Sequence, residues 1–170
     1  MAKTRTANEL LIVALQDLND AERAMVERLP SLQSNLSPGL GKFVGEELTR
    51  AEEQRRRLDQ WLTILDAPAT DAPNIWLRAV IDDATRDYET IEPGVLRDIA
   101  LVGAFRKGIQ AERVSYETAL GLARSTGKPD LEGSLRICRD EEAAADLDLA
   151  TLLDSLLTDL QRNYGSLAPD

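Results

Sequence analysis

The chain contains no histidine, and this absence removes a whole class of chemistry. Without an imidazole there can be no Ser–His or Cys–His nucleophile, no histidine general base and no histidine metal ligand. Cys138 is the single cysteine, so an internal disulfide is impossible and a reducing cytoplasm is the expected location. Any metal site in this protein therefore has to use other side chains.

Basic residues and long apolar runs are also scarce. Lysine and arginine number 20 against 30 aspartates and glutamates, which gives a net charge of −10. Nucleic acid and anionic lipid repel such a chain, so we expect neither a nucleic-acid nor a membrane partner. The apolar run from Leu10 to Leu15 is too short for a signal-peptide core or a transmembrane helix. A glycine-rich phosphate-binding loop is absent too.

Helical periodicity dominates what is present. With 170 residues and 43% hydrophobic content, the chain suits one domain spanning residues 1–170. In the first segment the apolar residues recur in steps of four and three, which is typical of a helix in a bundle. These residues are Leu11, Leu15, Leu18, Met25, Leu29 and Leu32. Similar stripes, interrupted by proline and glycine, predict helices over about 7–34, 38–66, 73–91, 95–126 and 130–163. No strand pattern competes with them.

Loop lengths indicate how these helices are arranged. Short turns join the first helix to the second and the fourth to the fifth, so each pair should form an antiparallel hairpin. The connection from Ala67 to Gly94 is much longer, and its helix could travel along most of the bundle. We therefore predict an all-α fold, a ferritin-like antiparallel four-helix bundle of two helical hairpins with a short crossover helix.

Each long helix carries a polar residue where its inward apolar stripe should continue. In chain order these residues are Glu22, Glu47, Gln54, Glu112 and Glu142, with Asp146 one turn further. A buried carboxylate costs several kcal/mol unless it is paired, protonated or bound to a cation. Residues equidistant from a hairpin turn lie side by side, so these groups should meet near the middle of the bundle. Carboxylates from facing helices form di-iron and di-manganese sites, so the pattern indicates a site for iron or manganese.

A purely structural role for these glutamates, without a metal, is the alternative interpretation. A single inward glutamate is more often half of a salt bridge, and the hairpin register places Arg50 at the level of Glu22. There the guanidinium could supply the positive charge of a metal. The Glu-x-x-His pairs usual in such sites are absent, since Arg50 stands three residues after Glu47. Cys138 lies one turn from Glu142 and is interpreted as a buried, small apolar residue.

The stretch LQDLNDAERAMVERLP, residues 15–30, resembles the first helix of a bacterial ferritin-like family of unknown function that includes YciE and YciF. The resemblance covers Leu10 to about Leu157, and it aligns the inward glutamate of the family with Glu22. In the second helix, the family's His-Leu-Glu-Glu-Thr run falls on residues 47–51 and reads Glu-Leu-Thr-Arg-Ala here.

The later helices resemble the family in part. The later glutamine of the family's second helix is kept as Gln54. The family's Glu-His-Tyr-Glu falls on residues 109–112, where only Glu112 is kept, and Tyr116 follows it. The family's Asp-Glu-Glu matches residues 140–142, with a later aspartate at Asp146. The resemblance implies a cytoplasmic, dimer-forming protein associated with stress responses, in which part of the ligand set has been replaced.

The sequence leaves two functions open and does not indicate whether the protein is an enzyme. One is a non-catalytic scaffold with an eroded di-metal site, which needs no cofactor. The other is a carboxylate-bridged di-iron or di-manganese protein that could oxidise iron(II), with the six polar residues of the inward stripes as ligands. In either case a homodimer is expected, with the apolar strip of Ile75, Trp76 and Ala79 as its contact surface.

Overall fold

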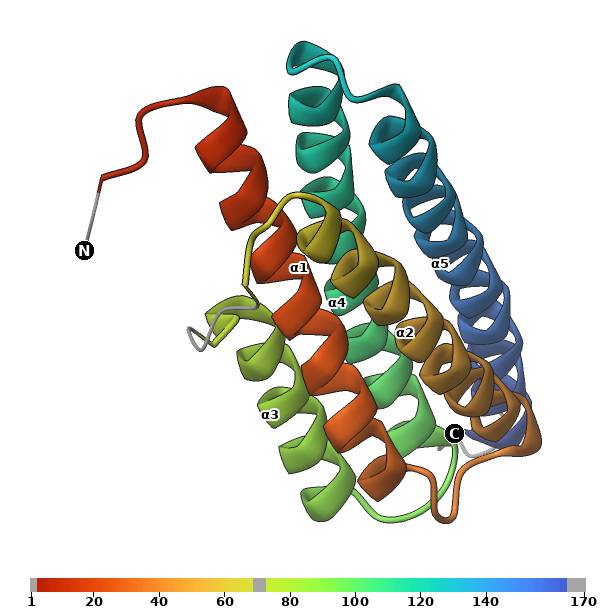
Figure 1. Ribbon diagram of the computed structural model, residues 1–170. Helices are drawn as coiled ribbons and strands as arrows, with labels where there is room; N and C mark the ends of the chain where they lie inside the picture. Colours follow the sequence, from red (N-terminus) through yellow and green to blue (C-terminus); the bar gives the residue numbers. More distant parts are fainter. Residues whose placement is uncertain (1–2, 69–72, 165–170) are drawn as a thin grey trace.

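The computed structural model describes residues 3–68 and 73–164 (Figure 1). These residues form five α-helices and one short 3₁₀ helix, and they contain no strand. The elements are α1 (Ala7–Arg28), η1 (Leu29–Leu32), α2 (Pro38–Ile64), α3 (Ile75–Thr90), α4 (Val95–Ser125) and α5 (Pro129–Tyr164).

The helix ends follow local sequence signals. α1 begins with a capping box, in which the Thr6 hydroxyl accepts from the backbone N–H of Glu9 and the Glu9 carboxylate accepts from that of Thr6. The first helix, expected to reach about residue 34, ends at Arg28, and η1 follows it. Pro30 lacks a backbone N–H, so the chain tightens into a 3₁₀ turn. At the far end of α4, Gly127 adopts a φ of 68°, a left-handed conformation that ends the helix.

The helices form two antiparallel hairpins joined by a crossover (Figure 1). α1 pairs with α2, α4 pairs with α5, and α3 lies against α1 and α4. Because α3 returns the chain to the end of the bundle where α2 began, α2 and α4 run in the same direction. The predicted all-α bundle with a crossover helix is confirmed.

The apolar core consists of two clusters on either side of a polar layer. One cluster contains Leu11, Leu15, Leu18, Leu58, Leu62 and Leu135, and the other contains Leu29, Leu40, Val44, Leu101, Phe105 and Leu149. On α2, α4 and α5 the change from one cluster to the other falls at Gln54, Glu112 and Glu142. Glu22 lies next to the change on α1. Such a layer interrupts apolar burial in the middle of the bundle, where burial is most complete, so it needs a compensating interaction.

Asp20 of α1 anchors the crossover helix. Its buried carboxylate accepts a hydrogen bond from the backbone N–H of Asn74 at 2.5 Å and from the Arg78 guanidinium at 3.1 Å, and it also pairs with Arg23. Asn74 caps α3 by accepting from the backbone N–H of Leu77 at 2.9 Å. Burial raises the pKa of Asp20, but these donors and positive charges outweigh burial and hold the pKa below its ordinary value.

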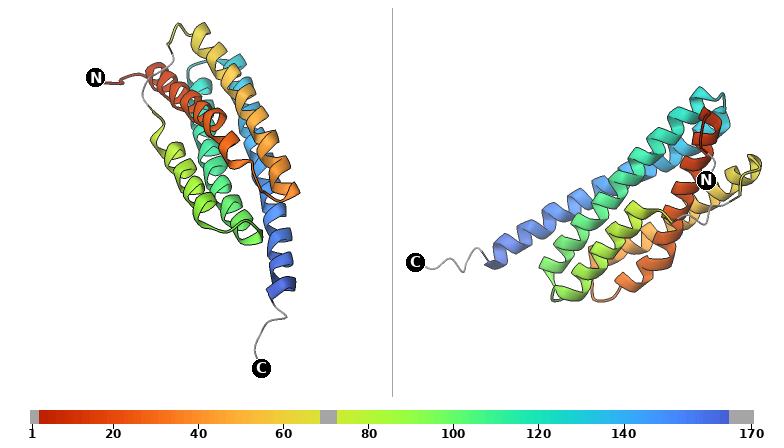
Figure 2. Two further views of the ribbon diagram at one scale, coloured as in Figure 1. Left: turned by 90° about the horizontal axis from the view of Figure 1, so that it is seen from below. Right: turned by 90° about the vertical axis from the view of Figure 1, so that its left-hand side faces the viewer.

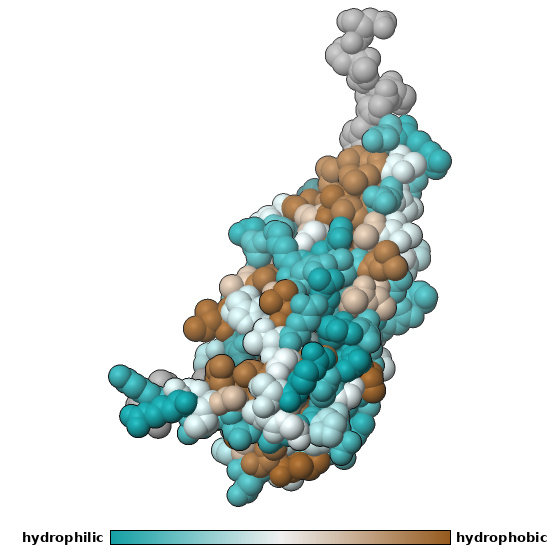
Figure 3. Space-filling view, turned by 90° about the horizontal axis from the view of Figure 1, so that it is seen from above, coloured by the Kyte–Doolittle hydropathy of each residue, from teal (hydrophilic) through white to brown (hydrophobic). Residues whose placement is uncertain are grey.

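α5 extends past the other helices at its C-terminal end (Figure 2). The surface seen in Figure 3 mixes hydrophilic and hydrophobic residues, with hydrophobic residues gathered near the C-terminal end of α5. Across the described ranges, none of the helices combines the length and the apolar character that crossing a membrane requires.

Candidate metal centre

A buried polar layer crosses the bundle near its middle. α1 contributes Glu22, α2 contributes Glu47 and Gln54, α4 contributes Glu112 and Tyr116, and α5 contributes Glu142. All six of these residues are at most 3% exposed. Five of the six residues that the inward stripes single out therefore lie in this layer, and Tyr116 joins them.

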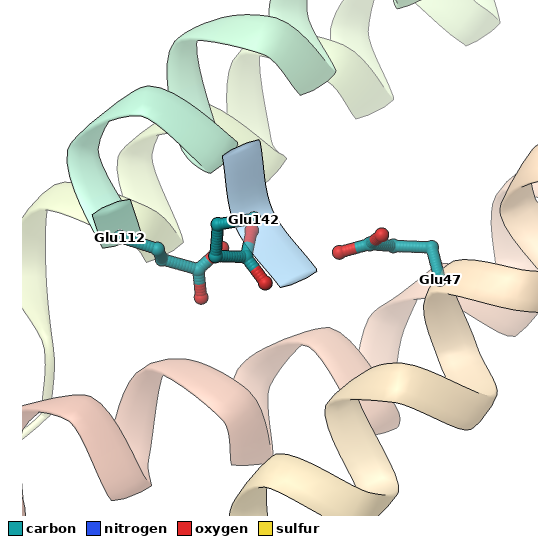
Figure 4. Close-up of side chains that lie close together, drawn as sticks. All are labelled: Glu47, Glu112 and Glu142. Atoms are coloured by element: carbon teal, nitrogen blue, oxygen red, sulfur yellow. The ribbon is translucent and has the colours of Figure 1, made fainter. Parts of the chain in front are cut away.

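Three glutamates of the layer form a tight cluster, which we call the glutamate triad. Glu47, Glu112 and Glu142 each place one carboxylate oxygen so that the three oxygens lie within 4.8 Å of one another. Figure 4 shows the carboxylates of Glu112 and Glu142 side by side, with that of Glu47 pointing toward them from α2. The three helices thus converge on a small space bounded by oxygen atoms.

Two oxygens of the triad have no hydrogen-bond partner within the described part of the chain. They are Oε1 of Glu112 and Oε2 of Glu142, and both are buried. Burial raises the pKa of Glu112 well above its ordinary value, and the neighbouring charges of Glu22 and Glu142 add to that rise. Burial, together with the charge of Glu47, raises the pKa of Glu142 to about 8. Without a bound metal ion, these carboxyl groups therefore hold protons at neutral pH.

Glu22 is hydrogen-bonded to Tyr116, outside the glutamate triad. The Tyr116 hydroxyl lies 2.7 Å from Oε1 of Glu22 and 3.0 Å from Oε1 of Gln54. Gln54 presents its carbonyl oxygen here because its amide nitrogen donates to Glu141 at 3.0 Å and to Glu142 at 2.9 Å. Tyr116 has one proton for two acceptors, so both contacts are hydrogen bonds only when Glu22 is protonated and donates to the tyrosine oxygen. Burial and the charge of Glu142 raise the pKa of Glu22, which agrees with this arrangement.

Arg50 pairs with a different partner from the one that its register predicts. Its guanidinium donates to Oε2 of Glu47, three residues earlier on α2, and the Arg50 side chain is 18% exposed. The i, i+3 spacing places Arg50 beside Glu47 on the same helix face, whereas Glu22 points toward Tyr116 on α4. The expectation that Arg50 neutralises Glu22 is therefore wrong, and the positive charge acts on the triad instead. Burial raises the pKa of Glu47, and the charge of Arg50 opposes that rise.

Asp146 lies to one side of the triad, in an ion pair. It accepts from the Arg106 guanidinium at 2.7 Å and from the Gln110 amide at 2.6 Å. The hydrogen bonds from Arg106 hold the pKa of Asp146 below its ordinary value. Its carboxylate is satisfied by these partners, in contrast to those of Glu112 and Glu142.

Comparison with known proteins assigns this chain and its fold to a family. The sequence profile of DUF892, a domain of unknown function, matches residues 6–161. The chain belongs to the DUF892 family. It is 25% identical over 150 residues to the protein YciF of Escherichia coli strain K12, covering 87% of this chain and 90% of YciF.

Solved structures agree with this assignment. The crystal structure of the E. coli stress protein YciF superposes on this DUF892 protein with a TM-score of 0.86 and 25% sequence identity, covering 91% of this chain and 99% of YciF. YcfI of Rhodopseudomonas palustris, 24% identical, reaches a TM-score of 0.80 over 86% of this chain and 94% of its own. A protein of Xanthomonas campestris, 15% identical, reaches 0.74 over 94% and 99%. The last two matches support the fold alone.

The oxygen-only triad of this DUF892 protein fits a hard divalent cation. Carboxylate oxygens suit iron(II), manganese(II), magnesium and calcium better than zinc, and the two unpartnered oxygens are free to coordinate. Cys138 does not contribute, because burial raises the pKa of its thiol to about 12. Its sulfur instead accepts a long contact of 3.6 Å from Arg57, which also pairs with Glu141 at 2.7 Å.

The sequence did not indicate a role at the site for Tyr116, which belongs to the layer, or for Glu141, which borders it. In the sequence Tyr116 continues an apolar stripe. In the structure its ring is buried in the core and only its hydroxyl belongs to the polar layer. Its spacing of four residues from Glu112 was the available signal. Glu141 reads as solvated helix surface, and only the contact with Gln54 connects it to the site.

Proposed function

We propose that this DUF892 protein binds a divalent metal ion, iron(II) or manganese(II), at the glutamate triad. The observation that carries the proposal is the pair of buried, unpartnered oxygens on Glu112 and Glu142, which face Glu47 from two other helices. A buried polar atom without a partner costs about 1–3 kcal/mol, and more when it is charged. Coordination of a cation removes that cost at both oxygens.

The charge of the site supports the same proposal. Three carboxyl groups held within 4.8 Å of one another cannot all ionise in an apolar environment without a positive charge between them. A divalent ion supplies that charge and replaces the protons that Glu112 and Glu142 otherwise hold. The bound ion would polarise any oxygen-containing group that reached it, and its ligands would be Glu47, Glu112 and Glu142.

Metal content and thermal stability test this function together. Protein purified without chelators is analysed for metal, and its melting temperature is measured with and without added manganese(II). We expect bound metal and a rise in melting temperature, because a ligand that binds only the folded state stabilises it. Glu112→Gln should remove both effects.

A matched control guards against binding at the acidic surface. Glu46 neighbours Glu47 on α2, but its side chain is 54% exposed and pairs with Lys42. Glu46→Gln should leave the metal content and the manganese response unchanged. Less than about a tenth of an equivalent of metal, with no manganese-dependent stabilisation, contradicts the proposed function.

A non-catalytic scaffold is the second candidate. It is favoured by the pairing of Arg50 with Glu47 and by the hydrogen bonds of Gln54 and Tyr116, which partly satisfy the layer without a metal. In that case Glu112→Gln leaves assembly unchanged and no metal co-purifies. For either function we propose a role in stress, because the homologue YciF is an E. coli stress protein. We also propose a cytoplasmic location, because Cys138 is the single cysteine of the sequence.

A further inference from the structure

Arg50 is the cationic side chain that pairs with the glutamate triad. Its guanidinium is bound to Glu47, and its side chain is only 18% exposed. Its charge acts on the other two members as well, since it lowers the pKa values of Glu112 and Glu142 against the effect of burial. An arginine stays protonated in proteins, so this positive charge is permanent.

A charge count limits what the site can accept. The three ionised glutamates carry three negative charges, and Arg50 cancels one of them. A single divalent ion balances the two negative charges that remain. A second divalent ion would leave the buried site with a positive excess, which an apolar environment strongly disfavours.

The neighbouring groups do not relieve this limit. Glu22 is the remaining carboxyl of the layer, and it is bound to Tyr116 at 2.7 Å. The amide nitrogen of Gln54 points its hydrogens at Glu141 and Glu142, and a cation cannot coordinate a nitrogen that donates. The space around the triad is therefore already shared with one built-in cation and one donor amide.

We infer that Arg50 acts as a built-in cation that restricts the proposed metal site to a single divalent ion. The inference rests on the proposed function and specifies its stoichiometry. Arg50 in this interpretation is a specificity-determining residue, since it decides how many ions the triad accepts without ligating any of them.

Substitution of Arg50 tests the inference directly. The full-length protein, stripped with a chelator, is dialysed against manganese(II), and bound metal per chain is measured. Electron paramagnetic resonance then distinguishes an isolated manganese(II) ion from a spin-coupled pair. The natural protein and Arg50→Lys should bind a single ion with the spectrum of an isolated centre. Arg50→Glu replaces the positive charge with a fourth carboxylate, and we expect it to bind two ions with the spectrum of a coupled pair.

Arg50→Gln tests the same charge without adding a carboxylate, and it decides the question if Arg50→Glu does not fold. Removing the positive charge should tighten binding of the single manganese(II) ion by about tenfold or more. Arg57 provides the matched control: it lies two turns further along α2, its side chain is 21% exposed, and it pairs with Glu141 outside the triad. Arg57→Gln should leave both stoichiometry and affinity unchanged.

The outcomes separate the inference from the proposed function. If the natural protein binds no manganese(II), the proposed function fails and the inference falls with it. If the natural protein binds a coupled pair, the function stands and the inference is overturned. The inference is also overturned if Arg50→Glu folds but still binds a single ion, or if Arg50→Gln binds no more tightly than Arg57→Gln.

Discussion

Replacing Glu142 by glutamine should stabilise the metal-free protein. The folded state raises the pKa of Glu142 to about 8, whereas an unfolded glutamate titrates near about 4.3. Between these two pH values the folded protein keeps a proton that the unfolded chain releases, so stability falls as pH rises. The cost is about 1.4 kcal/mol per pH unit, or about 3–4 kcal/mol at pH 7. Glutamine does not bear this cost, and its Oε1 can still accept from Gln54.

Urea unfolding of metal-free protein, followed by far-UV circular dichroism, measures this effect. The Glu142→Gln variant should be more stable than the natural protein by about 3 kcal/mol at pH 7 and by about 1 kcal/mol at pH 5. Glu141→Gln is the control, since that neighbouring side chain is 30% exposed and should change stability by less than about 1 kcal/mol. Equal or lower stability of Glu142→Gln at pH 7, or the same difference at both pH values, refutes the reasoning.

Three further predictions concern the rest of the molecule. The melting temperature of the metal-free protein should fall between pH 5 and pH 8, because the buried glutamates keep protons only when the protein is folded. Manganese(II) should raise the melting temperature more at pH 8 than at pH 6, because the metal displaces those protons. An increase that does not depend on pH is evidence against proton release on metal binding. Asp20→Ala should cost about 2–4 kcal/mol in urea unfolding by releasing the buried N–H of Asn74 and the Arg78 pair, whereas Asp82→Ala, which breaks an exposed ion pair with Arg28, should change little. We also propose a homodimer through the face of α3 that presents Ile75, which is 79% exposed; light scattering should show a dimer, and Ile75→Lys a monomer.

Much of the polar layer could be predicted because it interrupts a regular pattern. In a helix that faces a core, a glutamate on the apolar stripe stands out at once, and the hairpin geometry then places residues equidistant from a turn side by side. Glu22, Glu47, Gln54, Glu112 and Glu142 follow from these two rules. The crossover helix could be predicted as well, because a long connection with its own amphipathic segment must run along the bundle.

The partners within the layer could not be predicted from the sequence. Register counted from a turn is uncertain by a residue or two, and a long side chain can reach either way along its helix. Arg50 therefore pairs with Glu47 on its own helix, although the same count placed it opposite Glu22. Asp146 lies on the same helix as Glu142 but turns to Arg106. Periodicity determines which face a residue occupies, and competition among neighbours determines its contacts.

The site at the glutamate triad is tested most directly by crystals of the full-length protein soaked in manganese(II). Anomalous scattering locates the metal without reference to its effect on stability. We predict a single strong anomalous peak bounded by the carboxylates of Glu47, Glu112 and Glu142, with the Arg50 guanidinium still on Glu47. Manganese bound only at the surface, with no peak among these three side chains, contradicts the proposed metal site.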